Sequence, residues 1–245
     1  MLLIGSHVSP YARKAIFALE MKGIDYAVDP ITPFLGNDEF SRLSPLRRIP
    51  VLIHGDLVLN DSSAICEYLD EMYPDPPLMP ATAAERARAR WLEEYADTRL
   101  GDLTIWGLFY QRVVAPRVRK RATDEDRVAR VIARELPEAL DWIEVQAPAE
   151  RFLFDHICTA DATFAAFFRN AAIAGFTVDP ARWPRTAAWL ARVEAVPAFA
   201  RTIIYEQALI AVPAKERREA LRAAGAKLSE KTYGETEPRA SIMLD

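Results

Sequence analysis

Residues 48–62 read RIPVLIHGDLVLNDS and combine strand, turn and helix-start signals within fifteen residues. Two apolar runs, residues 51–53 and 57–59, flank Gly55-Asp56, where glycine can adopt the positive φ of a tight turn. The pattern therefore predicts a β-hairpin over residues 49–59. Asp61-Ser62 then opens a helix that is predicted to run to Met72, with its apolar side chains on one stripe.

The residues before the hairpin alternate strand and helix signals. Residues 1–5 form a short apolar run of strand length. Pro10 suits the first turn of a helix, with Ser9 as its N-cap and apolar residues at helical spacing over residues 12–22. A second strand is predicted over residues 26–28, and a loosely helical stretch follows. The predicted order of elements is βαβαββα, an α/β domain.

The sequence pattern changes after residue 75. Four prolines fall within residues 74–80, which indicates a stiff connector. Every later periodic segment is helical, and strand-like alternation does not return. These helices are predicted at residues 83–114, 124–146, 159–174 and 184–194, with another after Pro197. We therefore expect an α/β domain (1–75), a linker (76–82), an all-α helical bundle (83–210) and a partly loose C-terminal extension (211–245) with an exposed helix over 215–231.

Composition excludes several classes of protein. The net charge of −4 over 245 residues gives no global positive field for nucleic acid or anionic membrane. Cys66 and Cys158 are the two cysteines, without metal-ligand spacing, which argues against a disulfide scaffold or a zinc site and fits a reducing cytoplasm. No apolar run reaches membrane-spanning length, and the first residues lack the features of a signal peptide. We expect no metal, nucleic-acid or membrane partner.

Four local features, taken together, resemble the glutathione transferase superfamily over about residues 1–205. They are Ser9-Pro10-Tyr11, the RIPVL of residues 48–52, Asp61-Ser62, and WPRTAAWLARVEAVPAFA at residues 183–200. The resemblance implies a thioredoxin-like N-terminal domain that binds glutathione as co-substrate. It also implies an all-helical C-terminal domain and a homodimer.

Ser9 is the candidate catalytic residue. A hydroxyl at a helix N-terminus can donate to a thiolate, and the helix dipole there favours an anion, so the pKa of a thiol bound beside it falls. The resemblance assigns this activation of glutathione to Ser9. A plain N-cap is the alternative role. Tyr11 and then Ser6 rank behind Ser9 as candidates.

Five further residues are expected to bind glutathione. Ile49-Pro50 resembles the family's cis-proline corner, whose backbone would pair with the cysteinyl part of the tripeptide. A trans proline that begins an edge strand is the alternative. Asp61 offers charge for the γ-glutamyl ammonium, and Ser62 offers donors for the carboxylate, unless the pair only caps a helix. Arg48 resembles the basic residue that meets the backbone or the glycyl carboxylate, although Arg47 could be the one that faces inward.

Aromatic side chains supply a candidate pocket for the second substrate. Trp106, Phe109 and Tyr110 lie at near-helical spacing on the long helix after the linker, a stripe that in most proteins packs in the core. In the resembling family this helix borders the electrophile pocket, so these three residues and Tyr11 are its candidates.

One position departs from the family pattern. The helical domain of these proteins has S/T-x-x-D at a helix start, but this chain has Cys158-Thr159-Ala160-Asp161. A thiol is a poor acceptor, so either Thr159 takes over the capping role or this helix start is weaker.

The leading hypothesis is a glutathione transferase that attacks an apolar electrophile with the glutathione thiolate. LDEMYPDPPLMP at residues 69–80, followed by an Arg-rich helix, also looks like the stringent starvation protein A group, whose members share the fold but act as RNA polymerase partners. A glutathione-dependent isomerase would use the same serine-type site. A thiol-disulfide reductase is disfavoured, because it needs a cysteine where Ser9 stands.

Overall fold

The computed structural model describes residues 1–239, and the chain forms two compact units. One unit combines Met1–Pro76 with the chain from Pro197 onward, and the other is Pro77–Val196. The helix α9 (Pro197–Ile210) packs against the first helix of the chain and so falls in the first unit. This division differs from the predicted boundary, which kept the helical domain continuous to residue 210.

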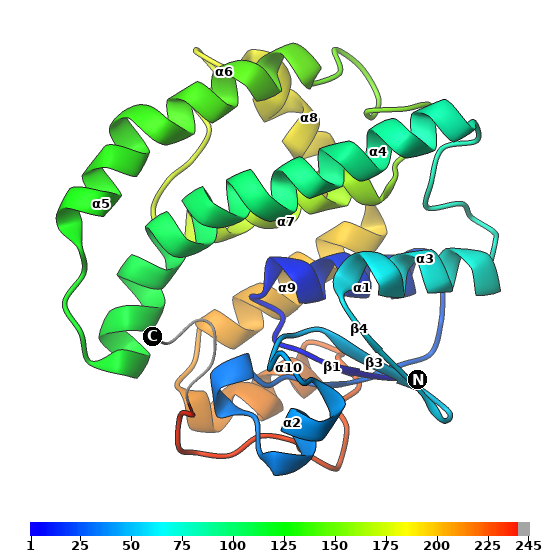
Figure 1. Ribbon diagram of the computed structural model, residues 1–245, viewed down its shortest axis with the longest axis vertical. Coiled ribbons are helices and arrows are strands. Elements are labelled where there is room, and N and C mark those ends of the chain that lie inside the picture. The colour runs from blue at the N-terminus through cyan, green and yellow to red at the C-terminus, as the bar shows by residue number, and fades with distance from the viewer. Residues whose placement is uncertain (240–245) are drawn as a thin grey trace. The chain divides into compact units, whose positions relative to one another are not determined.

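The first unit contains the predicted βαβαββα order (Figure 1). Its elements are β1 (Leu2–Ile4), α1 (Pro10–Met21), β2 (Ala27–Asp29), η1 (Pro33–Leu35), α2 (Asp38–Leu43), β3 (Val51–His54), β4 (Leu57–Asn60), α3 (Ser62–Met72), α9, η4 (Ala214–Glu216) and α10 (Arg217–Ala223).

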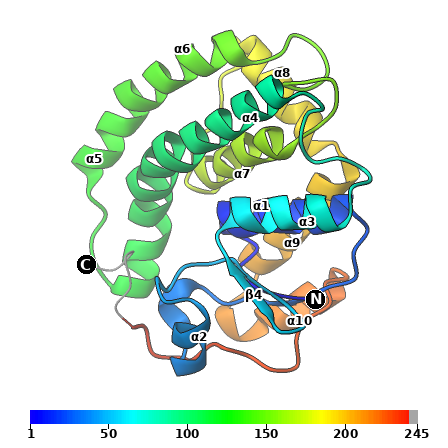
Figure 2. The ribbon, with the colours of Figure 1, turned by 45° about the vertical axis from the view of Figure 1, so that its right-hand side comes forward.

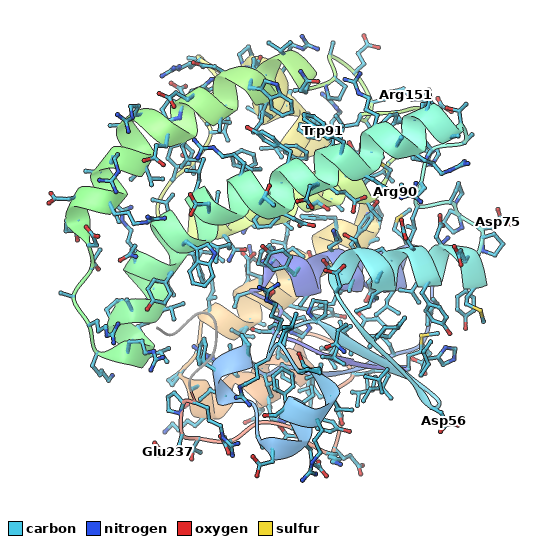
Figure 3. All side chains as sticks on the ribbon, viewed as in Figure 1. Asp56, Asp75, Arg90, Trp91, Arg151 and Glu237 are labelled. Atoms are coloured by element: carbon cyan, nitrogen blue, oxygen red, sulfur yellow. The ribbon has the colours of Figure 1, made fainter. Side chains whose placement is uncertain are left out.

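A four-stranded mixed sheet lies at the centre of this unit. The strand order is β2-β1-β3-β4, with β1 parallel to β2 and antiparallel to β3. The predicted hairpin is confirmed, since β3 pairs with β4 across Gly55, whose φ is +60°. Asp56 lies at the tip of the hairpin (Figure 3). The sheet has the thioredoxin-like arrangement that the resemblance implied.

Helices cover both faces of this sheet. Figures 1 and 2 show α1 and α3 together on one side and α2 on the other. Ile4, Phe40, Ile49 and Val51 are buried in a common cluster that joins β1 and β3 to α2. Because Ile49 belongs to this cluster, packing holds the segment that leads into β3.

The second unit is helical throughout its ordered elements, as predicted. They are α4 (Ala83–Tyr95), η2 (Ala96–Arg119), α5 (Glu125–Arg130), η3 (Val131–Glu135), α6 (Leu136–Gln146), α7 (Thr159–Ile173) and α8 (Pro184–Glu194). The apolar helix α7 packs against η2, α4 and α8. Among the described residues, no helix combines the length and the apolar character needed to cross a bilayer.

The start of α7 answers the question raised by Cys158. The Thr159 hydroxyl donates to Glu93 and does not cap the helix. The Asp161 carboxylate instead accepts from Cys158 N at 3.0 Å and from Cys158 Sγ at 3.2 Å. Of the two alternatives, the shift of the cap to Thr159 is therefore wrong, because that side chain has a buried partner elsewhere.

The end of the chain is more ordered than its composition indicates. The predicted helix over 215–231 is much shorter, since α10 ends at Ala223. Residues 226–239 are here called the C-terminal strap, and the first part of the strap pairs with the edge strand β2. Val28 N donates to Lys227 O at 2.8 Å, and Ser229 N donates to Val28 O at 3.0 Å. The rest of the expected loose tail, residues 240–245, lies outside the described residues.

Candidate functional site

Ser9 occupies the predicted position at the N-terminus of α1. It is the N-cap, with an extended backbone, and Pro10 follows it in the first turn. Ala12 N donates to Ser9 Oγ at 3.3 Å, and the residue is half-buried. A hydroxyl that accepts one such bond keeps its own proton for donation. Because the first turn of α1 contains no acidic residue, the positive end of the helix dipole is not neutralised there.

Gly5 brings the start of α1 close to Ile49-Pro50. Ile4 lies opposite Val51 in the β1–β3 register. A Cβ on Gly5 would lie 3.0 Å from Ala12 Cβ and 3.6 Å from Pro50 Cα. The Ile49-Pro50 peptide bond is cis, which confirms the inference drawn from the resemblance. The absence of a side chain at residue 5 thus lets the Ser9 helix approach the proline corner.

Asp61 and Ser62 lie at the N-terminus of α3. Asp61 is its N-cap, and the carboxylate oxygen Oδ1 accepts from Ser63 N at 2.8 Å and from Ala64 N at 3.2 Å. Asp61 has φ +82°, a region that costs a non-glycine residue about 1–3 kcal/mol. Asp61 is exposed while Ser62 is buried. The capping role is therefore real, and the exposed carboxylate can still meet a ligand ammonium.

The two arginines before Ile49 have different surroundings. Arg47 is half-buried, and its guanidinium donates to Gly36 O at 2.8 Å and lies 5.7 Å from the centre of the Phe40 ring. Arg48 is exposed, and Arg48 N donates to Ser44 Oγ at 2.9 Å. Arg47 is therefore the one that faces into the protein, whereas the Arg48 side chain is open to solvent.

The two competitors of Ser9 also differ in access. Ser6 is buried, and Val8 N lies 3.5 Å from Ser6 Oγ. Tyr11 is half-buried in the first turn of α1. Burial makes Ser6 the least accessible hydroxyl of the three, which agrees with its last rank.

The aromatic candidates on η2 form a small group within the second unit. The rings of Trp106 and Tyr110 are 5.8 Å apart, and both residues are half-buried. Phe109 is buried. Tyr11 belongs to the first unit, so the electrophile pocket stays a prediction.

Several residues near Ser9 were not identified from the sequence. The loop before Ser9 is held by Arg13, whose Nη2 donates to His7 O at 3.2 Å and whose guanidinium forms a fully buried ion pair with Glu206 of α9. Val8 packs against the cluster around Tyr205 and Leu209. The one available sequence signal was an arginine within an apolar helical segment, which indicates that a buried charge needs a partner. That partner, Glu206, lies far away in sequence.

His7 is buried in the same loop. Its ring meets that of Tyr205 edge-on at 5.1 Å, and neither ring nitrogen has a hydrogen-bond partner within residues 1–239. Burial, with a smaller contribution from the Arg13 charge, lowers the pKa of His7 to about 3. The imidazole is therefore neutral at physiological pH, and it does not add a positive charge beside Ser9.

A second missed contact links α1 to the start of α3. Lys14 is buried, and its Nζ donates to Ser63 Oγ at 2.8 Å. This bond ties the helix that begins at Ser9 to the helix that begins at Asp61-Ser62. Within residues 1–239, no three His, Cys, Asp or Glu side chains gather in a way that could hold a metal ion.

Comparisons with known proteins match the first unit most closely. The family described as the glutathione S-transferase N-terminal domain matches residues 3–77. Glutathione S-transferase Z1 of Arabidopsis thaliana is 42% identical over 82 residues, which are 32% of this chain and 37% of that protein. A stringent starvation protein A homolog of Haemophilus ducreyi is 40% identical over 80 residues, 33% of this chain and 37% of that protein. The chain thus spans little more than a third of the length of these curated relatives.

A solved structure extends the similarity over most of the chain. The glutathione S-transferase of Rhodospirillum rubrum F11 is 30% identical, with a TM-score of 0.75, and the match covers 82% of this chain and 90% of that one. The similarity therefore extends beyond residues 3–77, which the family model matches, to helices that follow in the chain. The chain belongs to the glutathione transferase superfamily.

Proposed function

We propose that the protein is a glutathione transferase in which Ser9 stabilises the glutathione thiolate for attack on an apolar electrophile. In this reaction the thiol proton leaves to solvent, the glutathione sulfur forms a bond to the electrophilic carbon, and that carbon releases its leaving group with the bonding electron pair, as halide from an aryl halide. Ser9 donates a hydrogen bond to the sulfur, and the N-terminus of α1 supplies positive potential.

One observation carries the proposal: a half-buried hydroxyl caps a helix whose first turn has no acid, and Gly5 lets that helix approach Ile49-Pro50. In the proposed complex the cysteinyl backbone pairs beside Ile49-Pro50, which puts the thiol near Ser9. Asp61 meets the γ-glutamyl ammonium, while Ser62 at the N-terminus of α3 meets its carboxylate. Arg48 takes the opposite, glycyl end.

Replacement of Ser9 by alanine tests the assignment. We expect kcat/KM with a model aromatic electrophile to fall on the order of a hundredfold, because a hydrogen bond to the reacting anion is lost. Glutathione affinity should change less than about threefold, since the tripeptide keeps its other contacts. Ser9→Thr, which keeps a hydroxyl, should retain part of the activity, and Ser6→Ala is the matched control. Full activity of Ser9→Ala would refute the assignment.

The residues proposed to contact the electrophile are Tyr11 of the first unit and, within the second unit, Trp106, Phe109 and Tyr110. Conjugation and glutathione-dependent isomerisation use the same thiolate, so the pocket and not Ser9 decides between them. A panel of apolar aryl halides and of unsaturated isomerisable acids, assayed with glutathione, separates the two reactions.

A second candidate is a non-catalytic partner of RNA polymerase. The observation that favours it is the 40% identity to the stringent starvation protein A homolog over 80 residues. This hypothesis predicts no retention on immobilised glutathione and co-purification of polymerase subunits. Retention with elution by free glutathione supports the transferase.

We also propose, from the resemblance, that the protein is a homodimer with a cytoplasmic location. Its helical domain is proposed to begin after the proline-rich linker at 76–82. Sedimentation velocity tests the homodimer directly. A species with twice the chain mass is expected, and a concentration-independent monomer would contradict it.

A further inference from the structure

We propose that the C-terminal strap orders residues 31–49 and so determines how tightly the glycyl end of glutathione is bound, with Asp29 and Tyr233 as positioning residues. The inference rests on the proposed function, because it concerns the same glutathione site. In the proposed complex the γ-glutamyl end lies at α3 and the cysteine at Ile49-Pro50. An extended tripeptide then continues past Ile49 toward Arg48 and the segment before it.

The strap is bound to this segment through its backbone. Asn37 N donates to Tyr233 O at 2.8 Å, Glu235 N donates to Leu35 O at 2.7 Å, and Arg239 N donates to Phe34 O at 2.8 Å. Figures 1 and 2 show the strap passing beside α2. These bonds pair an otherwise irregular loop with a second chain segment, which restricts its backbone as a neighbouring strand would.

Asp29 anchors the strap from the end of β2. Its fully buried carboxylate accepts from Tyr233 N at 2.7 Å, from Thr232 Oγ1 at 3.2 Å and from Arg218 Nη1 at 3.1 Å. A buried carboxylate is stable only when paired and hydrogen-bonded. Asp29 therefore requires the strap to be in place, and the strap gains a charge-assisted bond at its centre.

Packing extends this order to the residue before the proline corner. The side chain of Tyr233 packs against the cluster that contains Ile31, Phe40 and Ile49. Gly234 forms a bridge with Gly36, and a Cβ on Gly234 would lie only 2.8 Å from Ile31 Cγ2. The strap thus approaches so closely that an added methyl group would force either Ile31 or the strap to shift.

Arg47 completes the connection from the strap to Arg48. Its Nη2 donates to Gly36 O at 2.8 Å and to Pro33 O at 3.3 Å, and both carbonyls belong to the loop that the strap binds. When the strap holds this loop, these two carbonyls are fixed and Arg47 has a defined position. Arg48 and Ile49 follow directly in the chain.

The test compares two ligands that differ only in the glycyl residue. Binding of glutathione and of γ-glutamylcysteine is measured by calorimetry for the wild type, Tyr233→Ala and Gly234→Ala. Tyr233→Ala removes the packing on the cluster that contains Ile49, whereas Gly234→Ala adds one methyl and keeps every other strap group. Glu237→Ala is the matched control, because this strap residue is exposed and lies at the outer edge in Figure 3.

The wild type should bind glutathione more tightly than γ-glutamylcysteine. In Tyr233→Ala and Gly234→Ala, glutathione affinity should fall about tenfold and γ-glutamylcysteine affinity less than about twofold, because one ordered contact is lost at the glycyl end alone. Glu237→Ala should match the wild type. An equal fall in affinity for both ligands would leave the ratio of the two affinities unchanged. That result would indicate a general structural role of the strap and overturn the proposal.

The outcomes also separate this inference from the proposed function. If the wild type binds neither ligand, the glutathione site itself is wrong. If the wild type binds both ligands equally, or the variants keep the wild-type preference, only the role of the strap is refuted.

Discussion

The helices α1 and α7 both begin at a small side chain with a hydrogen-bonding group, but they use that position differently. At α1, Ser9 is half-buried and accepts one bond of 3.3 Å from Ala12 N. At α7, Cys158 is fully buried, and the Asp161 carboxylate accepts from Cys158 N and Leu153 N at 3.0 Å and from Trp189 Nε1 at 2.7 Å.

The N-terminus of a helix can therefore serve either stability or chemistry. The start of α7 has an internal carboxylate that accepts from the N-cap amide of Cys158 and neutralises the positive end of the helix. The start of α1 has no acid in its first turn. An external anion can therefore take the position that Asp161 occupies at α7. On this account α7 holds its unit together, and α1 binds a thiolate.

Removal of Asp161 should produce the largest effect. In Asp161→Ala, the buried donors Cys158 N and Trp189 Nε1 and the half-buried Leu153 N lose their acceptor, so the free energy of unfolding should fall by about 3 kcal/mol or more. Urea unfolding followed by tryptophan fluorescence measures it. Asp161→Asn, which keeps one acceptor oxygen, is the control with a smaller expected loss. A loss below about 1 kcal/mol would mean that α7 does not depend on its internal acid.

The buried His7 in the loop before α1 should make the free energy of unfolding sensitive to acid. Because burial lowers the pKa of His7 to about 3 from 6.5, the unfolded chain binds a proton that the folded chain excludes between these pH values. The contribution of the neutral His7 imidazole to the free energy of unfolding is complete above pH 6.5 and is lost as pH falls toward 3. Between these values the free energy of unfolding falls with a slope that approaches about 1.4 kcal/mol per pH unit.

Replacement of His7 by Phe isolates this contribution. Urea unfolding at a series of pH values from 8 to 5 should give a shallower acid slope for His7→Phe than for the wild type, whatever the absolute stability of the variant. The carboxylates are common to both proteins and cancel in the difference. Parallel curves would contradict a buried neutral imidazole in the loop before Ser9.

Cys158→Ser should have the smallest effect on the free energy of unfolding, and it tests the N-cap of α7 directly. A serine hydroxyl is a better acceptor for the Asp161 amide than a thiol, so the free energy of unfolding should rise by about 0.5–1 kcal/mol. The measurement is the same urea titration, and Cys66→Ser, a buried cysteine outside a helix cap, is the control. Equal shifts in both variants would attribute the effect to burial and not to the cap.

Local features of the fold were predictable because their causes lie within a few residues. The Gly55 turn, the N-cap at Ser9 and the helix start at Asp61 each depend on side chains and backbone of the same turn. The apolar periodicity located the helices of the second unit for the same reason. The proximity of Ser9 to Ile49-Pro50 came from the family resemblance, since no local pattern contains it.

Features that depend on distant partners were not predictable. Tyr233 N donates to the Asp29 carboxylate across 204 positions of sequence. Local composition does not contain this contact, and it predicts a charged helix and a loose tail instead. The charged composition of residues 215–231 is compatible with a helix, but pairing with β2 and the buried Asp29 decides otherwise. Arg13 needs Glu206 to be stable in the core, and this partner has no sequence signal either.

The most direct test of an open, thiolate-binding α1 is the pKa of the glutathione thiol when bound. Titration of thiolate absorbance in the ultraviolet, with wild type and Ser9→Ala each saturated with glutathione, measures it. The account predicts that the wild type lowers the thiol pKa from about 8.5 to about 7 or below, and that Ser9→Ala returns it most of the way. The same thiol pKa in both proteins would contradict the account.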